Sequence, residues 1–315
     1  MTVEPIFSKL NHVGVVVRDM KNAAAYYESL GIGPFVKVDR EVLREPDAGG
    51  DGLKTMRTTF GSVGLELIQP GSRGSHWRQF LEEKGEGIIH LGFDASNVDE
   101  EERRAVGSGL RLLYRRRFKE GGGVSGFDTR EFGGIAFELI RYPPGLINTS
   151  GVVKEPYSRL HHVGYVVADL DAAVRFYEGL GLGPFKQPNL PGVRTQATQY
   201  GRPVTNRKLR NMGTHIGTTR IELEFLQPVE NAPVQEEFLK ERGEGANHFG
   251  FKVADVDAEA AKLERKGFKA IYTVTFSSGI KCKYLDTDKL GGVLFEFWQP
   301  PTVGITSPPP VMPSP

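Results

Sequence analysis

The sequence contains a single cysteine, Cys282, among its 315 residues. One cysteine cannot form an internal disulfide, which favours a reducing compartment, and it excludes a metal site built from several thiolates. An excess of one charge is also missing, because 40 Lys and Arg stand against 39 Asp and Glu. The balanced charge argues against a nucleic-acid partner, which would need a broad basic surface.

Long apolar runs are missing as well. No uninterrupted apolar segment approaches the roughly 18 residues that span a bilayer, and the first residues lack the basic and apolar regions of a signal peptide. We therefore expect a soluble, cytoplasmic protein without a membrane partner. At roughly 100 to 200 residues per domain, the length predicts two domains.

The chain repeats itself, which fixes where those domains lie. A segment that starts at Leu10, LNHVGVVVRDMKNAAAYYESLGIGPF, recurs from Leu160 as LHHVGYVVADLDAAVRFYEGLGLGPF, at an offset of 150 residues. Later segments match at an offset of 158, so the second copy carries eight extra residues between Phe185 and about Ile221. We predict an N-terminal domain over 1–147, a linker over 148–158, a C-terminal domain over 159–303 and a Pro-rich tail over 304–315.

Each copy is itself doubled. His12 opens an apolar run that a helix follows, and His90 opens a similar run before a second, charged helix. After each helix come β-like stretches, which end in GLELIQP and IAFELIRYP. The unit of one strand, one helix and about three strands occurs four times. This pattern predicts an α+β fold of four βαβββ modules, two in each domain, that enclose a concave space.

Polar residues in apolar strands cost free energy to bury without a partner, and each half holds four of them at matching places. Two are the histidines that open the modules, and two are glutamates in closing strands, 72 residues apart in both halves. Alignment of the copies selects Glu224 over its neighbour Glu222. The same alignment selects His162 over His161. The predicted metal ligands are His12, Glu66, His90 and Glu138 in the first half and His162, Glu224, His248 and Glu296 in the second.

Two neutral imidazoles and two carboxylates would neutralise a divalent cation and leave coordination positions for water or substrate oxygens. Without a thiolate, the ligand set suits Zn, Ni, Co, Mn or Fe(II) and does not choose among them. Such a cation would polarise a carbonyl or enolate oxygen, so that a nearby carboxylate could move a proton. The other interpretation of the matching His and Glu residues is that they serve the fold and were copied by duplication, without binding a metal.

These features resemble the vicinal oxygen chelate superfamily, which includes glyoxalase I and methylmalonyl-CoA epimerase. The resemblance rests on the openings NHVGVVVRDM and HHVGYVVADL and on the order His, Glu, His, Glu, and it covers residues 8–143 and 158–301. It implies one metal cup per domain, formed by two paired modules. In glyoxalase I the last Glu can serve as a base, which would assign a catalytic role to Glu138 and Glu296.

The resemblance also exposes a difference between the halves. In the epimerase a first-module Glu outside the metal shell helps to exchange the proton. Glu41 or Glu45 could fill that place in the first half, whereas the second half has no acidic residue between Phe185 and Glu222.

The leading prediction is a metal-dependent lyase or isomerase, of the glyoxalase or epimerase type, that acts on a small carbonyl or acyl-thioester substrate through a metal-stabilised enolate. One alternative is a two-domain extradiol-type dioxygenase with Fe(II) held by His162, His248 and Glu296, which would leave Glu224 unexplained. Another is a non-enzymatic small-molecule binding protein. We expect about two metals per chain and a monomer or a homodimer.

Three arginines in the run RLLYRRRFK, Arg115, Arg116 and Arg117, could receive an anionic substrate, although a charged edge strand is the favoured interpretation. His76 and His215 have no counterparts in the other half, and we predict that both lie at the surface.

Overall fold

The computed structural model describes residues 5–38, 53–71, 74–144, 151–188, 190–217 and 219–301. Glu41 and Glu45 lie outside the described residues, as does the predicted tail. None of the helices in the described ranges has the length and apolar character that crossing a membrane requires.

The N-terminal half forms one sheet of eight strands in the order β2-β3-β4-β1-β5-β8-β7-β6. Its first module contains β1 (Leu10–Val16), α1 (Met20–Leu30), β2 (Val36–Lys37), β3 (Lys54–Phe60) and β4 (Val63–Gln69). Its second module contains β5 (Gly87–Asp94), α3 (Val98–Gly107), β6 (Leu112–Arg117), β7 (Gly123–Phe127) and β8 (Ala136–Arg141). The first strand of each module pairs in parallel with its last strand, and the modules join where β1 and β5 run antiparallel.

The predicted βαβββ modules are confirmed. One helix between them, α2 (His76–Glu83), was not predicted.

The C-terminal half forms a sheet of nine strands in the order β11-β10-β15-β16-β17-β14-β9-β13-β12. Its first module contains β9 (Leu160–Val166), α4 (Leu170–Gly179), β10 (Arg194–Gln199), β11 (Arg202–Pro203), β12 (Lys208–His215) and β13 (Glu222–Glu230). After α5 (Pro233–Arg242), the second contains β14 (Gly245–Lys252), α6 (Val256–Glu264), β15 (Ala270–Phe276), β16 (Lys281–Leu285) and β17 (Leu294–Gln299). The N-terminal sheet ends with β8 at Arg141 and the C-terminal sheet begins with β9 at Leu160. The domain boundaries stay a prediction.

The segment with the eight extra residues changes the strand pairing of the C-terminal half. Within it, β10 and β11 form a hairpin, and β10 pairs antiparallel with β15, which belongs to the other module. The hairpin therefore leaves its own module and extends the opposite edge of the sheet.

Each module helix begins at an acidic or amide cap. The Asp19 side chain accepts a hydrogen bond of 2.9 Å from the backbone N–H of Asn22, and Asp169 does the same at Ala172 with 3.0 Å. Such caps satisfy N–H groups that the first helical turn leaves without partners. Helix α1 ends at Gly31, whose positive φ of 97° suits a left-handed C-cap.

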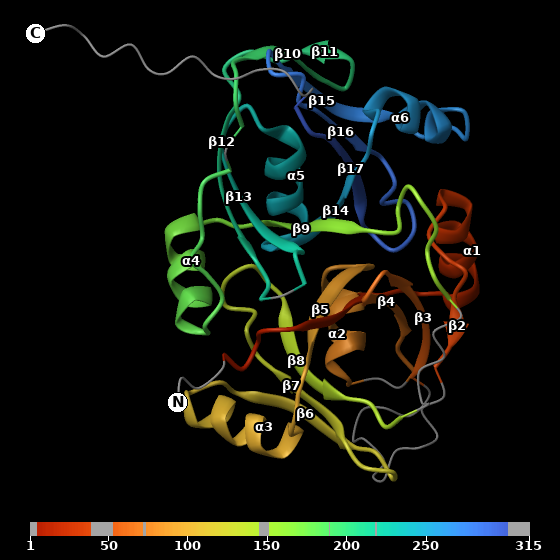
Figure 1. The fold of residues 1–315 in the computed structure, drawn as a ribbon, viewed down its shortest axis with the longest axis vertical. Coiled ribbons are helices and arrows are strands. Elements are labelled where there is room, and N and C mark those ends of the chain that lie inside the picture. The colour runs from red at the N-terminus through yellow and green to blue at the C-terminus, as the bar shows by residue number, and fades with distance from the viewer. Residues whose placement is uncertain are drawn as a thin grey trace, which may run out of the picture.

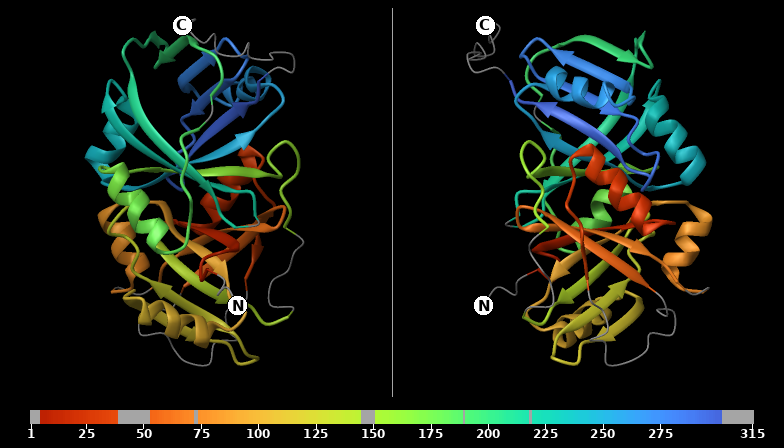
Figure 2. Two further views of the ribbon diagram at one scale, coloured as in Figure 1. Left: turned by 60° about the vertical axis from the view of Figure 1, so that its left-hand side comes forward. Right: turned by 90° about the vertical axis from the view of Figure 1, so that its right-hand side faces the viewer.

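The two halves share one hydrophobic core. Successive strand residues point to opposite faces of a sheet, so Val13 and Val15 enter this core while His12 faces the other way. Figures 1 and 2 show α1 and α4 at the level where the halves meet. Tyr27 of α1 contacts Phe295 of the C-terminal sheet, with ring centroids 6.4 Å apart, and Tyr177 of α4 contacts Phe137 of the N-terminal sheet at 5.5 Å. Each sheet is thus covered in part by a helix of the other half.

We expect Tyr27→Ala to lower the free energy of unfolding by about 3 to 5 kcal/mol, because it leaves a large cavity in the core. The Tyr27 side chain is 1% exposed and its hydroxyl has no hydrogen-bond partner in the described chain, so Tyr27→Phe is the matched control and should be nearly neutral. Urea unfolding followed by circular dichroism measures both. A loss below about 1 kcal/mol, or separate transitions for the two halves, would contradict a shared core.

Candidate metal centres

Four side chains of the C-terminal sheet converge on the face that points away from the shared core. They come from four adjacent strands and offer ligand atoms within 4.8 Å of one another: His162, Glu224, His248 and Glu296. The two imidazole Nε2 atoms lie 3.1 Å apart, and Oε2 of Glu296 lies 2.9 Å from that of His162 and 3.2 Å from that of His248. The structure therefore brings together all four residues predicted for this half.

The N-terminal sheet brings together three of its four predicted residues, His12, His90 and Glu138. The two Nε2 atoms lie 3.0 Å apart, and Oε2 of Glu138 lies 3.3 and 3.4 Å from them. Glu66 is not in this group. Its Oε1 lies 2.8 Å from Nη1 of Arg57, while its Oε2 is 3.9 Å from Nε2 of His12.

Each histidine ring lies over a glycine of the neighbouring antiparallel strand. A Cβ atom at Gly14 would lie 2.2 Å from the His90 ring, and one at Gly92 would lie 2.1 Å from the His12 ring. The C-terminal half repeats the arrangement, with the His248 ring over Gly164 and the His162 ring over Gly250. The sequence pattern His-x-Gly in all four module openings therefore has a steric cause, because any other residue would displace the opposite ring.

The orientation of the histidines suits a metal ion. Oδ1 of Asn11 lies 3.0 Å from Nδ1 of His12, and Oδ1 of Asn247 lies 2.7 Å from Nδ1 of His248. The amide oxygen can only accept, so Nδ1 carries the proton and the Nε2 lone pair points to the centre of the group. In each group, therefore, one imidazole turns its Nε2 lone pair toward the other ring, with the two Nε2 atoms 3.0 to 3.1 Å apart.

The carboxylates of the C-terminal group favour the same conclusion. Burial alone would lower the pKa of His162, but the hydrogen bond and charge of Glu296, together with the charge of Glu224, raise it to about 9. The buried Oε2 atom of Glu224 has no hydrogen-bond partner in the described chain. Two nitrogen and two oxygen donors with a surplus of negative charge fit a divalent metal.

Two tyrosines complete the surroundings of these groups, and the sequence pattern did not reveal them. The Tyr114 hydroxyl donates to Glu138, and the Tyr284 hydroxyl lies 3.3 Å from Nε2 of His248. They do not occupy matching positions, because at the offset of 158 Tyr114 on β6 aligns with Tyr272, and Tyr284 on β16 aligns with Gly126. The orienting residues Asn11 and Asn247 did have a signal, because each directly precedes a predicted ligand.

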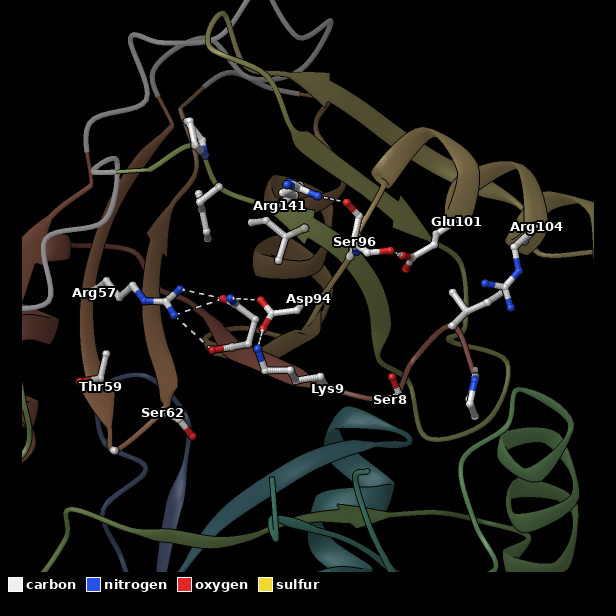
Figure 3. A pocket seen from close by; sticks show the side chains of 18 of the residues that line it. Ser8, Lys9, Arg57, Thr59, Ser62, Asp94, Ser96, Glu101, Arg104 and Arg141 are labelled. Atoms are coloured by element: carbon white, nitrogen blue, oxygen red, sulfur yellow. Dashed lines mark hydrogen bonds and ion pairs between the residues drawn. The ribbon is translucent and has the colours of Figure 1, made fainter. Parts of the chain in front are cut away.

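A cavity of about 810 Å³ in the N-terminal half is lined by Asn11, Arg57 and Tyr142 but by none of the three grouped residues. Figure 3 shows Arg57 pointing into it, with hydrogen bonds of 3.1 and 3.2 Å from its guanidinium to Oδ1 of Asn11. Lys9 and Asp94 form an ion pair of 2.6 Å at its wall. A second cavity, of about 790 Å³, includes His161, the counterpart of Asn11, and is lined by residues of both halves, among them Phe60 and Lys252. Each cavity thus reaches the residue that precedes a predicted ligand.

The arginine run does not form one anion site. Arg115 and Arg117 both donate to Glu102 of α3, with distances of 2.9 Å from Arg115 Nε and 2.8 Å from Arg117 Nη2. Arg116 is buried and its guanidinium lies 4.5 Å from the centroid of the Trp77 ring. The favoured interpretation, an edge strand with solvated charges, is therefore also incomplete.

His76 is half-buried rather than at the surface as predicted, whereas His215 is exposed as predicted. His76 begins α2, and its ring stacks on Tyr114 at 4.4 Å. Burial, with the nearby charge of His90, lowers the pKa of His76 from 6.5 to about 3. The unpredicted helix α2 carries this side chain into the protein, and a lone histidine in a polar stretch gave no sign of it.

We expect His76 to weaken the fold in acid. Below pH 6.5 the unfolded chain binds a proton at this residue that the folded chain does not bind until about pH 3, so acidification stabilises the unfolded state. Between pH 7 and pH 5 the loss should reach about 2 kcal/mol, and His76→Phe should remove it. Urea unfolding at both pH values tests this, with His215→Gln as the exposed control. Equal acid sensitivity of the His76→Phe variant and the wild type would disprove the assignment.

Removal of an orienting amide should weaken metal binding without removing a ligand. We expect Asn247→Ala to lower the affinity of the C-terminal group for Zn²⁺ by 10- to 100-fold, as is usual for residues that orient a ligating histidine. Asn247→Asp keeps the accepting oxygen and should retain most of the affinity. Competition with a chromophoric chelator measures both, and equal losses in the two variants would contradict the role of the oxygen.

Comparisons with known proteins agree with this geometry. A family model described as the Glyoxalase/Bleomycin resistance protein/Dioxygenase superfamily matches residues 11–126 and again residues 161–281. An ethylmalonyl-CoA/methylmalonyl-CoA epimerase of Cereibacter sphaeroides is 29% identical over 109 residues, which cover 34% of this chain and 76% of the relative. The uncharacterized protein YqjC of Bacillus subtilis is 29% identical over 135 residues, 42% of this chain and 91% of its own.

Solved structures share the two-domain fold. A mutant of 4-hydroxymandelate synthase from Streptomyces coelicolor superposes with a TM-score of 0.58 at 16% identity, over 96% of this chain and 95% of that chain. Identity at this level shows the fold alone. The family match, by contrast, covers both halves and most of the chain, so the protein belongs to the Glyoxalase/Bleomycin resistance protein/Dioxygenase superfamily in a tandem form with two domains.

Proposed function

We propose that the protein is a metal-dependent enzyme of the lyase or isomerase type, which moves a proton next to the carbonyl group of a small carbonyl or acyl-thioester substrate. The C-terminal group is the principal centre in this proposal. The observation that carries it is the position of Glu224, whose Oε2 lies 3.5 Å from Nε2 of His248 and so supplies a second carboxylate. A facial triad of two histidines and one carboxylate has no use for that residue.

The side chains of the C-terminal group divide the work. His162, His248, Glu224 and Glu296 would hold the metal, which when bound would act as a Lewis acid toward a substrate carbonyl oxygen. Glu296 is the base that takes the proton from the adjacent carbon, the role that the last glutamate has in glyoxalase I. The Tyr284 hydroxyl beside His248 can donate a hydrogen bond to a substrate oxygen.

The names of related proteins also support an acyl-thioester substrate. The proteins that match about a third of the chain at 29% identity include epimerases of methylmalonyl-CoA and ethylmalonyl-CoA, which are acyl thioesters. In the N-terminal half Tyr114 donates to Oε1 of Glu138, and, against the effect of burial, this hydrogen bond lowers the pKa of the carboxyl group and so makes it a weaker base. For this reason we assign the base to Glu296 and place Glu138 second.

One observation favours a second candidate, a dioxygenase that uses Fe(II). Glu296 approaches His162 and His248 to within 2.9 and 3.2 Å, which is also the grouping of a facial triad, and the fold covers 95% of the chain of a 4-hydroxymandelate synthase. Glu224 would then have no assigned role.

Metal analysis and isotope exchange together test the proposal. Protein purified without added metal should contain up to two divalent ions per chain, and in ²H₂O it should place deuterium on the carbon next to the carbonyl of an acyl thioester such as methylmalonyl-CoA. Glu296→Gln should slow exchange by about 10² to 10⁴-fold, the usual contribution of a general base. Glu222→Gln is the control, because this carboxylate lies on β13, the strand that carries Glu224, and stands outside the group. A single iron per chain, with oxygen uptake on a catechol or an aromatic 2-oxo acid, would replace the proposal with the dioxygenase.

A further inference from the structure

The two metal groups differ at one carboxylate although the backbone around it is the same. Glu66 pairs with Gly14 in the parallel ladder of β4 and β1, and Glu224 pairs with Gly164 in the ladder of β13 and β9. The two glutamates therefore start from equivalent backbone positions. Only Glu224 joins its group, so the cause lies in the surrounding side chains.

One difference lies on the neighbouring strand. Arg57 of β3 stands opposite Glu66, and Gly213 of β12 stands opposite Glu224. The Arg57 side chain is 5% exposed and forms an ion pair of 2.8 Å with Glu66, which is fully buried. A buried carboxylate needs a cation or hydrogen-bond donors nearby. The Arg57 guanidinium supplies both to Glu66, so this carboxylate does not need a metal ion to compensate its charge.

A second difference lies in the same two strands, β3 and β4 in the N-terminal half and β12 and β13 in the C-terminal half: the positions of a charged residue and a glycine are interchanged. The Arg57 guanidinium lies over Gly64, where a Cβ atom would be 2.2 Å from its Cζ atom. In the C-terminal half the equivalent of Gly64 is Glu222, whose carboxylate lies over Gly213, where a Cβ atom would be 1.7 Å from Oε1. In the N-terminal half the charged residue is Arg57 on β3 and the glycine is Gly64 on β4. In the C-terminal half the glycine, Gly213, is on the first of the two strands, β12, and the charged residue, Glu222, is on the second, β13.

A second contact holds Glu66 from across the sheet. The Tyr142 hydroxyl, just beyond the end of β8, donates a hydrogen bond of 2.7 Å to Oε1 of Glu66. Strands β8 and β4 are separated by β1 and β5, so this side chain crosses the face that carries the metal group. Its counterpart in the C-terminal half is Pro300, which has no hydroxyl to donate.

We propose that Arg57 and Tyr142 keep Glu66 out of the N-terminal site, so that this site holds its metal through three protein ligands and the C-terminal site through four. The inference rests on the proposed function, in that both groups bind a divalent metal. Arg57 and Tyr142 are positioning residues, since they act through Glu66.

The difference in ligands sets a difference in the chemistry that each site accepts. A divalent cation with the Glu138 carboxylate keeps one positive charge, and the Arg57–Glu66 pair beside it is neutral. A divalent cation with Glu224 and Glu296 keeps none. The N-terminal site therefore takes an anionic ligand, such as a carboxylate, at its additional open position, and the C-terminal site takes a neutral carbonyl oxygen.

Reciprocal exchange of the residues tests this inference with Co²⁺ as the probe. Each site is measured alone, in a background where both histidines of the other site are replaced by alanine. Arg57→Gly with Tyr142→Phe should free Glu66 and raise the Co²⁺ affinity of the N-terminal site at least tenfold, and Glu66→Gln added to these changes should cancel the gain. Arg141→Ala is the control, because Arg141 lines the same cavity and its described side-chain contact is with Ser96.

The reverse exchange is Gly213→Arg with Glu222→Gly, which places an arginine opposite Glu224. It should lower the Co²⁺ affinity of the C-terminal site at least tenfold. This variant provides a second test if the first does not fold. Azide, a small anion, should change the Co²⁺ absorption spectrum of the wild-type N-terminal site and leave that of the C-terminal site unchanged.

Unchanged affinity in folded variants of either exchange, or an equal azide response at both sites, would overturn the inference. Failure of the proposed function has a different signature. In that case the affinities would follow the exchanges as expected, while Glu296→Gln would leave deuterium exchange unaffected.

Discussion

The structure depends on the antiparallel contact between the first strands of two modules. In each half, two histidines reach across this contact, and each ring lies over a glycine of the partner strand. The pairing brings two Nε2 atoms to within about 3.0 Å in one half and 3.1 Å in the other. Because β1 and β5, like β9 and β14, are inner strands, the last strands β8, β13 and β17 can each bring a glutamate to the same group, whereas Glu66 of β4 pairs with Arg57 instead.

This contact also explains why the repeat was informative. A module by itself carries one histidine and one glutamate, which is too few to hold a metal. Two modules related by the strand pairing place two of each on one face. The internal doubling of the sequence therefore predicted the fold and the four modules, and seven of the eight residues it singled out come together in two groups. That these groups bind metal stays a prediction. The two asparagines before His12 and His248 follow the same logic, since each hydrogen-bonds to the ring that comes after it.

What could not be predicted lies in residues that break the repeat. Arg57 and Gly213 are equivalent only when the strand register is known, because the turn between β3 and β4 is shorter than the one between β12 and β13. The sequence alone thus gave no reason to separate Glu66 from Glu224. The burial of His76 depends on how α2 packs against Tyr114, a contact between residues 38 positions apart. Departures from the repeat are where the two halves acquired different properties.

The inserted hairpin has a consequence for how the chain assembles. Strand β10 completes its ladder only with β15, which follows about 75 residues later, and Tyr27 of α1 meets Phe295 near the end of the described chain. During synthesis the first helix therefore emerges long before the strand that covers it. Contacts of such high sequence separation slow folding, because a large loop must close before they form. The native core of the N-terminal half is completed only when the last strand of the C-terminal half has been made.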